Sequence, residues 1–289
     1  NLAYQGGAGI YLKDANATFV SCVFIDNDAG SSGSGGAAYL EDSNVSFQSS
    51  LFQTNDSGYQ GGAIRWDNST GSMIDSNFTS NRNTASNGAG CLYLLNSSPS
   101  ILRCRFTNNL TLANSYGGAI KFQNSNASIT ESFFIGNQSQ ANSAGAIYLD
   151  ADSNATFSQN HFELNSAAQF GGAIFADDSD LILNGGTFLG NYANYGGGIA
   201  TQGSVSCSFL NMRILGNESN ASASSSGGFA YFNTGSTGST FVNCVISRNK
   251  SNGRGGVYRP KGATRFVNCS IVGNQAGTEG GVAILFSGD

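Results

Sequence analysis

Several residue types are scarce in this chain, and each shortage excludes a class of structure or site. Among 289 residues there are 2 prolines, 1 histidine and 13 lysines and arginines. So few prolines leave no proline-rich linker between domains, and we expect residues 1–289 to form a single domain. The lone histidine, His161, has no second histidine or cysteine spaced as a metal ligand. Neither a metal nor another cofactor is therefore expected.

Positive charge and long apolar segments are also scarce. The formal net charge is -5, whereas proteins that bind nucleic acid need a basic stripe. No apolar run approaches the about 20 residues of a transmembrane helix. We therefore expect neither nucleic-acid binding nor membrane insertion of this segment.

A repeat of about 27 residues, written about eleven times, accounts for most of the sequence. Each unit begins with small residues and an aliphatic one, as in Gly61-Gly62-Ala63-Ile64, and closes on Phe-x-x-Asn, as in Phe78 to Asn81. The short apolar runs are aromatic or β-branched and are bounded by turn residues. This pattern is typical of strands rather than helices.

The spacing inside each unit predicts corners between strands. A second apolar residue precedes the Phe-x-x-Asn position by five, as Phe47 precedes Phe52. Strand side chains alternate with a period of two, so an odd spacing cannot place both residues on one face of a straight strand. The prediction is an all-β fold, a right-handed, single-stranded parallel β-helix (a solenoid) of about 10–11 coils of roughly 27 residues. Because neither end carries a polar capping repeat, we expect a segment of a longer solenoid or a subunit that stacks end to end.

The asparagine of Phe-x-x-Asn recurs in every coil and is predicted to form a structural ladder. Amides stacked in register hydrogen-bond to the coils above and below. The column contains Asn27, Asn55, Asn81, Asn109, Asn137, Asn165, Asn191, Asn217, Asn249 and Asn274.

Asn-x-Ser/Thr occurs about fourteen times, which is typical of a glycosylated, secreted protein. Five of these sequons coincide with the ladder and are expected to be buried: Asn55, Asn109, Asn137, Asn217 and Asn249. N-linked glycans are expected on the remaining sites, which are Asn16, Asn44, Asn68, Asn77, Asn96, Asn126, Asn154, Asn220 and Asn268. An alternative interpretation is that these triplets arise from composition alone, because the chain is rich in Asn, Ser and Thr.

Four of the cysteines precede the Phe-x-x-Asn position by two residues: Cys22, Cys104, Cys244 and Cys269. Cys244 and Cys269 belong to adjacent coils, where in-register Cα atoms lie about 4.8 Å apart, within the range of a disulfide. They are a candidate disulfide. Cys22 and Cys104 lie about three coils apart and are expected to be small buried residues.

Two further columns leave alternatives open. The first column contains acidic and amide residues: Asp14, Asp42, Asn68, Asn96, Asn124 and Asp178. It is either a carboxylate cleft or a row of calcium sites, or a column of turns in which Asp and Asn interchange. An aromatic column is read as Tyr11, Tyr39, Trp66, Tyr93, Tyr148 and Phe175. It is either an exposed strip suited to sugar stacking or lateral packing, or a strip covered by loops or glycans.

The pairing of Gly-Gly-Ala-Ile with Phe-x-x-Asn resembles the repeat of the chlamydial polymorphic outer-membrane proteins. The resemblance covers the whole chain and is carried by units such as Gly171-Gly172-Ala173-Ile174 with Phe188 to Asn191. It implies a right-handed parallel β-helix at a cell surface, usually adhesive or structural. Later units depart from the pattern, as at Gly228-Phe229-Ala230.

Three functional hypotheses follow. The first is a non-enzymatic, extracellular, glycosylated β-helix that acts as a shaft or filament subunit at a cell surface and contacts copies of itself end to end or laterally. The second is an adhesin that binds host or matrix ligands through loops such as Asn217 to Gly227. The third and weakest is a polysaccharide lyase or hydrolase that uses Asp14 and Asp42.

Overall fold

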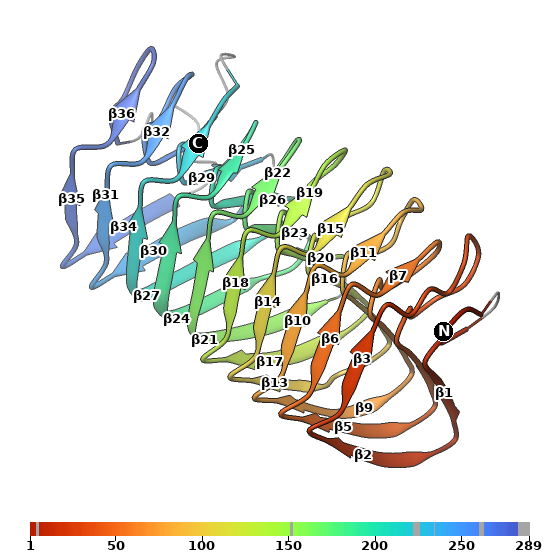
Figure 1. Cartoon of the computed structure of the whole chain (residues 1–289). Helices are drawn as coiled ribbons and strands as arrows, with labels where there is room; N and C mark the ends of the chain where they lie inside the picture. The colour runs from red at the N-terminus through yellow and green to blue at the C-terminus, as the bar shows by residue number, and fades with distance from the viewer. Residues whose placement is uncertain (4–5, 151–152, 222–225, 234, 260–262, 283–289) are drawn as a thin grey trace.

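The computed structural model describes residues 1–3, 6–150, 153–221, 226–233, 235–259 and 263–282. These residues form a parallel β-helix, an elongated rod in which each coil lies on the one before it (Figure 1). Equivalent positions recur at steps of 25 to 32 residues, and 28 is common. The all-β solenoid prediction is confirmed, and its right-handed coiling stays a prediction.

The first side of each coil contributes a strand to a 10-stranded parallel sheet. Each strand follows the glycine pair of its repeat, and its register places Ile10 beside Ala38 and Ala38 beside Ile64. Its strands are β1 (Ile10–Lys13), β4 (Ala38–Glu41), β8 (Ile64–Asp67), β12 (Leu92–Leu95), β16 (Ile120–Gln123), β20 (Ile147–Leu149), β23 (Ile174–Asp177), β26 (Ile199–Gln202), β29 (Ala230–Phe232) and β33 (Tyr258–Arg259).

The second and third sides together form a 17-stranded sheet. Second-side strands are β2 (Asn16–Val20), β5 (Asn44–Gln48), β9 (Thr70–Ile74), β13 (Ser100–Leu102), β17 (Asn126–Thr130), β30 (Gly238–Val242) and β34 (Ala263–Val267). Third-side strands are β3 (Val23–Ile25), β6 (Leu51–Gln53), β10 (Asn77–Thr79), β14 (Arg105–Thr107), β18 (Phe133–Ile135), β31 (Val245–Ser247) and β35 (Ser270–Val272). In three coils a single long strand continues around the corner: β21 (Asn154–Glu163), β24 (Leu181–Leu189) and β27 (Ser206–Leu215).

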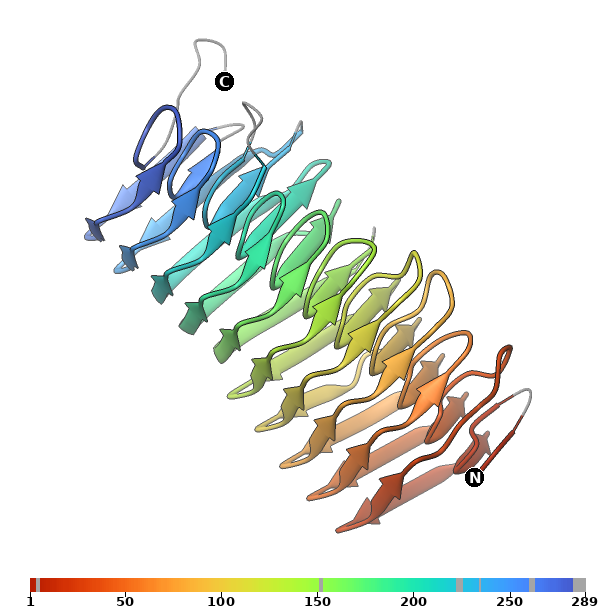
Figure 2. The same cartoon turned by 45° about the horizontal axis from the view of Figure 1, so that its top comes forward.

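A fourth strand, two residues long, follows the ladder asparagine in each of nine coils. These strands form a 9-stranded parallel sheet, and the loops that follow them arch side by side along one edge of the rod (Figure 2). They are β7 (Asp56–Ser57), β11 (Arg82–Asn83), β15 (Leu110–Thr111), β19 (Gln138–Ser139), β22 (Ser166–Ala167), β25 (Tyr192–Ala193), β28 (Glu218–Ser219), β32 (Lys250–Ser251) and β36 (Gln275–Ala276).

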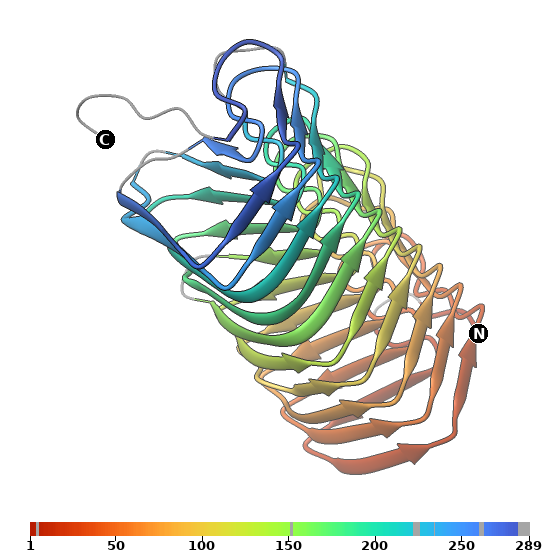
Figure 3. The ribbon, with the colours of Figure 1, turned by 90° about the vertical axis from the view of Figure 1, so that its left-hand side faces the viewer.

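Apolar side chains fill the narrow interior between the sheets. Figure 3 turns the rod so that the sheets enclosing this interior are seen obliquely along the axis. The phenylalanines of Phe-x-x-Asn stack in register, with 4.7 Å between the ring centroids of Phe78 and Phe106 and 6° between their planes. The glycine pairs keep the wall thin. A Cβ atom at Gly145 would lie 2.1 Å from the carbonyl oxygen of Gly172 in the next coil, so this position requires glycine.

Most corners pair a residue in the left-handed backbone region with an inward polar residue, although Met212 follows the left-handed Asn211. In one coil the left-handed residues are Asp75 and Ser80, with φ of 52° and 55°, and the buried residues after them are Ser76 and Asn81. A non-glycine residue in this region costs about 1–2 kcal/mol. Hydrogen bonds of the inward residue offset that cost.

Within the asparagine column, the side-chain amide of Asn137 uses both its donor hydrogens and its oxygen in hydrogen bonds. The Nδ2 of Asn137 donates to Asn165 Oδ1 at 2.9 Å and to the carbonyl oxygen of Phe106 at 3.0 Å. Its Oδ1 accepts from the Nδ2 and backbone N–H of Asn109 at 2.9 and 3.1 Å. The same pattern of Nδ2-to-Oδ1 bonds links the column from Asn1 to Asn274.

We predict that Asn137→Ala lowers the free energy of unfolding by about 2–4 kcal/mol, because it leaves buried groups of Asn109 and Phe106 unpaired. Urea unfolding followed by circular dichroism measures the effect. The matched control is Asn77→Ala, whose side chain is exposed on β10, and which should change stability by no more than about 0.5 kcal/mol. Equal effects of the two substitutions would contradict a stabilising role for the ladder.

Candidate functional site

The sequons separate into an exposed set and a buried set. All nine asparagines predicted to carry glycans are exposed: Asn16, Asn44, Asn68, Asn77, Asn96, Asn126, Asn154, Asn220 and Asn268. The ladder residues are buried except for Asn274, which is partly buried. The five sequons that belong to the ladder have no exposed surface: Asn55, Asn109, Asn137, Asn217 and Asn249.

A buried ladder sequon is incompatible with a glycan in the folded chain. In Asn137, both Nδ2 hydrogens are used in hydrogen bonds, and a glycan would replace one of them. The sugar would also have to occupy the packed interior. These five positions therefore owe their Asn-x-Ser/Thr spacing to the fold, since the residue two positions later is itself a buried hydroxyl in β7, β15, β19, β28 or β32.

Six of the exposed sequons form one line along the corner between the first and second sides of the coil. There is one in each of six successive coils: Asn16, Asn44, Asn68, Asn96, Asn126 and Asn154. In-register pairing joins Asn16 to Asn44 and Asn126 to Asn154. Asn68 and Asn96 lie two positions earlier, at the left-handed residue of the same corner. We call this line of six residues the sequon edge.

The remaining exposed sequons lie elsewhere. Asn77 begins β10, Asn220 follows β28, and Asn268 is the left-handed residue at the corner before β35. Part of the candidate ligand-binding loop from Asn217 to Gly227 lies outside the described residues, at 222–225.

The proposed carboxylate column lies on the same corner as the sequon edge. Asp14 and Asp42 have φ of 50° and 49°, and Asn68, Asn96, Asn124 and Asp178 share this left-handed conformation. Asn68 Nδ2 donates to Asp42 Oδ1, and Asn124 Nδ2 donates to Asn96 Oδ1 at 2.6 Å. Asp and Asn interchange here because both residues tolerate left-handed turns, so the conformation agrees with the turn alternative.

A shallow hollow of about 340 Å³ opens beside the N-terminal part of this corner. Its lining includes Asp14, Asn16, Asp42, Asn44 and Asn68. Within the described residues, no group of three or more His, Cys, Asp or Glu side chains is arranged to hold a metal ion.

The register corrects the predicted aromatic column. Tyr39 pairs with Arg65, and Arg65 pairs with Tyr93. Trp66 belongs instead to the neighbouring inward column and has no exposed surface. The assignment of Trp66 was wrong because strand alternation places Ile64 inward, Arg65 outward and Trp66 inward.

Loops cover most of the aromatic strip. Tyr11 is 49% exposed, whereas Tyr93 and Tyr148 are 1% and 5% exposed. Aromatic residues of the arching loops pack onto the outer face of the 10-stranded sheet: Tyr116, Phe170 and Tyr195. The ring of Tyr116 stacks on Tyr148 with 4.5 Å between centroids. Of the two alternatives, coverage by loops therefore holds from Tyr93 onward, and Tyr11 alone among these residues is largely exposed.

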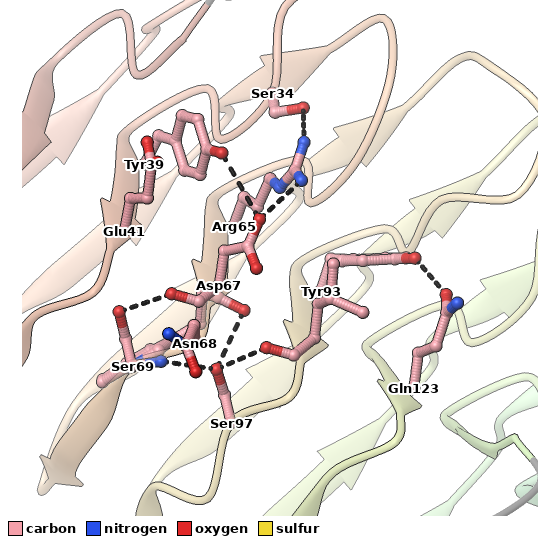
Figure 4. Close-up of polar contacts among 12 residues, drawn as sticks. Ser34, Tyr39, Glu41, Arg65, Asp67, Asn68, Ser69, Tyr93, Ser97 and Gln123 are labelled. Carbon is pink, nitrogen blue, oxygen red and sulfur yellow. Dashed lines mark hydrogen bonds and ion pairs between the residues drawn. The ribbon is translucent and has the colours of Figure 1, made fainter. Parts of the chain in front are cut away.

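Charged and polar side chains on this face contact one another in two groups, one around Arg65 and one that joins Tyr93 to Gln123 (Figure 4). Arg65 donates to Asp67 Oδ2 at 2.7 Å and to Ser34 Oγ at 3.3 Å. Its guanidinium lies 4.7 Å from the centroid of the Tyr39 ring. The Tyr93 hydroxyl donates to Gln123 Oε1, and burial raises the pKa of Tyr93 to about 12. These contacts tie neighbouring coils together on this face.

The candidate disulfide is absent, because Cys244 and Cys269 are free thiols. Each Sγ instead contacts a main-chain carbonyl oxygen of the preceding coil, that of Phe209 or Phe241, at 3.4 Å. The prediction was wrong because this column uses its side chains in the way serine does. Earlier in the same column, the backbone N–H of Cys104 donates to Ser132 Oγ at 3.1 Å.

The sequence interpretation missed two further polar ladders. At the sequon edge, the backbone N–H of Ser43 donates to Ser69 Oγ at 2.9 Å, and that of Ser69 donates to Ser97 Oγ at 3.0 Å. At the next corner, the backbone N–H of Ser50 donates to Ser76 Oγ at 3.0 Å. The available signal was the recurrence of Ser or Cys directly after each left-handed residue.

No family model matches this chain, and no curated protein or solved structure matches it either. In the described part of the chain, no helix is long and apolar enough to cross a membrane.

We predict that Cys104 resists alkylation in the folded protein at pH 8, because burial removes it from solvent and raises the pKa of its thiol to about 12. The partly buried Cys22 serves as the internal comparison and should react first. Peptide mass spectrometry after iodoacetamide treatment measures both. After unfolding without reductant, all 6 cysteines should react. Labelling of only four, with Cys244 and Cys269 protected, would contradict the free-thiol assignment.

Proposed function

We propose that this chain is a non-catalytic, extracellular shaft at a cell surface, with N-linked glycans on its outward sequons. The observation that carries the proposal is the separation of the sequons into nine exposed and five fully buried sites. The five buried sequons are accounted for by the ladder, and all nine exposed sequons lie outside it. Their alignment on the sequon edge would place sugars along one edge of a rigid rod.

The regularity of the coils supports a structural role. Each coil repeats a similar set of corners and inward columns, and several exposed charged side chains pair between neighbouring coils. Arg103 contacts Asp75 at 2.7 Å, and Lys250 contacts Glu218 at 2.8 Å. A uniform rod of this kind is suited to holding other groups at a distance from a surface. Partners in this proposal are further copies of the chain, end to end or lateral, and matrix or host surfaces that meet the glycan-free faces.

The turn conformation of Asp14 and Asp42 favours this proposal over a polysaccharide-cleaving enzyme. A pair of catalytic carboxylates needs different environments, so that one stays protonated while the other is ionised. Here the two residues repeat the same corner in successive coils. The similarity to the chlamydial surface-protein repeat remains part of the proposal and agrees with a location outside the cell.

We predict that intact-glycopeptide mass spectrometry of natural material finds glycans on exposed sites such as Asn16, Asn44 and Asn126. None is expected on Asn109 or Asn137, because a glycan would replace an Nδ2 hydrogen that is used in a hydrogen bond and would have to occupy the packed interior. A chain without any glycan would refute the glycoprotein assignment. A glycan on a ladder residue of the folded protein would refute the coil register.

A matched pair of variants sharpens this test in a eukaryotic secretory host. Asn126→Gln should remove the mass of one glycan, because its sequon begins β17 and faces solvent. Asn137→Gln should remove none, because that side chain is buried. Both sequons carry serine at the third position, so the comparison isolates burial.

A further inference from the structure

Lys121 is a buried lysine on the outward side of the 10-stranded sheet. It lies in β16 between Tyr93 and Tyr148 of the adjacent coils, and it is 2% exposed. Its Nζ lies 5.6 Å from the ring centroid of Tyr93 and 5.4 Å from those of Tyr116 and Tyr148. Three aromatic rings therefore exclude water from a primary amine.

The polar contact of this amine is a side-chain amide. Lys121 Nζ donates to Oδ1 of Asn87, which lies in the loop between β11 and β12. Asn87 is held in the left-handed region with φ of 67°. None of the ion pairs between described residues includes Lys121. The nitrogen thus lies in hydrogen-bond contact with the carbonyl oxygen of the Asn87 amide, and it forms no ion pair with a described carboxylate.

The surroundings act on the charge of the amine in opposite directions. Desolvation lowers the pKa of Lys121, and the negative charge of Asp150 opposes this shift. Aromatic faces favour the charged form. Loss of water favours the neutral form, and a neutral lysine amine is a nucleophile.

We propose that Lys121 and Asn87 condense into an intramolecular amide bond. The lone pair of Nζ attacks Cγ of Asn87, and a new C–N bond forms. The bond from Cγ to Nδ2 then breaks, one proton moves from Nζ to Nδ2, and ammonia leaves. No atom changes oxidation state and no further reactant is consumed. The bond joins residues 34 positions apart and fastens an arching loop to the next coil.

The test is the intact mass of the recombinant chain, measured under denaturing conditions. The expected mass lies below that of the sequence by one ammonia. Trypsin should fail to cleave after Lys121 in the unfolded chain, and a branched peptide should join this residue to the segment containing Asn87. Lys13, which pairs with Glu41 and is half exposed, is the internal control and should be cleaved normally.

Two variants identify the source of a lost ammonia. Lys121→Arg keeps the positive charge but cannot form the bond, and Asn87→Ala removes the acceptor, so both should show the full sequence mass. Asn87 precedes Gly88, and such a pair can also lose ammonia by closing a succinimide. A loss that persists in Lys121→Arg, or chain cleavage by hydroxylamine at this site, would overturn the proposal. An unmodified mass for the unsubstituted chain would also overturn it.

Discussion

The amide ladder of the Phe-x-x-Asn corner is the interaction on which the rest of the structure depends. A coil of this size must reverse direction several times, and each corner places a residue in an unfavourable left-handed conformation. The turn also directs backbone groups toward a dry interior, where unpaired donors and acceptors are costly. Asn137 and its equivalents solve both problems, because one side chain bonds to the coil on each side. Serine and cysteine perform a smaller version of the same task at the other corners. With the corners stabilised, the phenylalanine stack and the glycine wall follow from the register.

The surface depends on the same register. Asp56 lies in register with Arg82, and Glu218 with Lys250, so opposite charges face each other in neighbouring coils. Each exposed pair contributes only about 0–1 kcal/mol to stability. Their greater effect is on specificity, because a slip of the strand pairing by one residue would break these contacts and the ladder together. The loops add a second apolar layer over the 10-stranded sheet, in which Tyr116, Phe170 and Tyr195 take part. The rod therefore has one covered face, and its sequon edge remains open.

Features that recur in every coil could be predicted from the sequence, because a repeated position has a repeated environment. The β-helix class and the burial of columns such as that of Asn109 follow from spacing alone. Local features could not be predicted in this way. Trp66 was misplaced by one residue because the repeat does not mark where its strand alternation begins. Cys244 and Cys269 occupy the same position in adjacent coils, and this proximity led to the prediction of a disulfide. Only the corner contacts show that their thiols take the place of serine hydroxyls. The contact between Lys121 and Asn87 depends on a loop whose shape no repeat encodes.

The orientation of the hydrogen bonds has a mechanical consequence. Bonds between coils run along the axis of the rod, while the strands run across it (Figure 1). Tension applied along the axis therefore pulls each bond directly and separates one coil at a time, since a solenoid coil contacts only its neighbours. Each released coil of about 27 residues would lengthen the chain by roughly 90 Å. Such a rod would yield in small, equal steps under load and would absorb work before it failed.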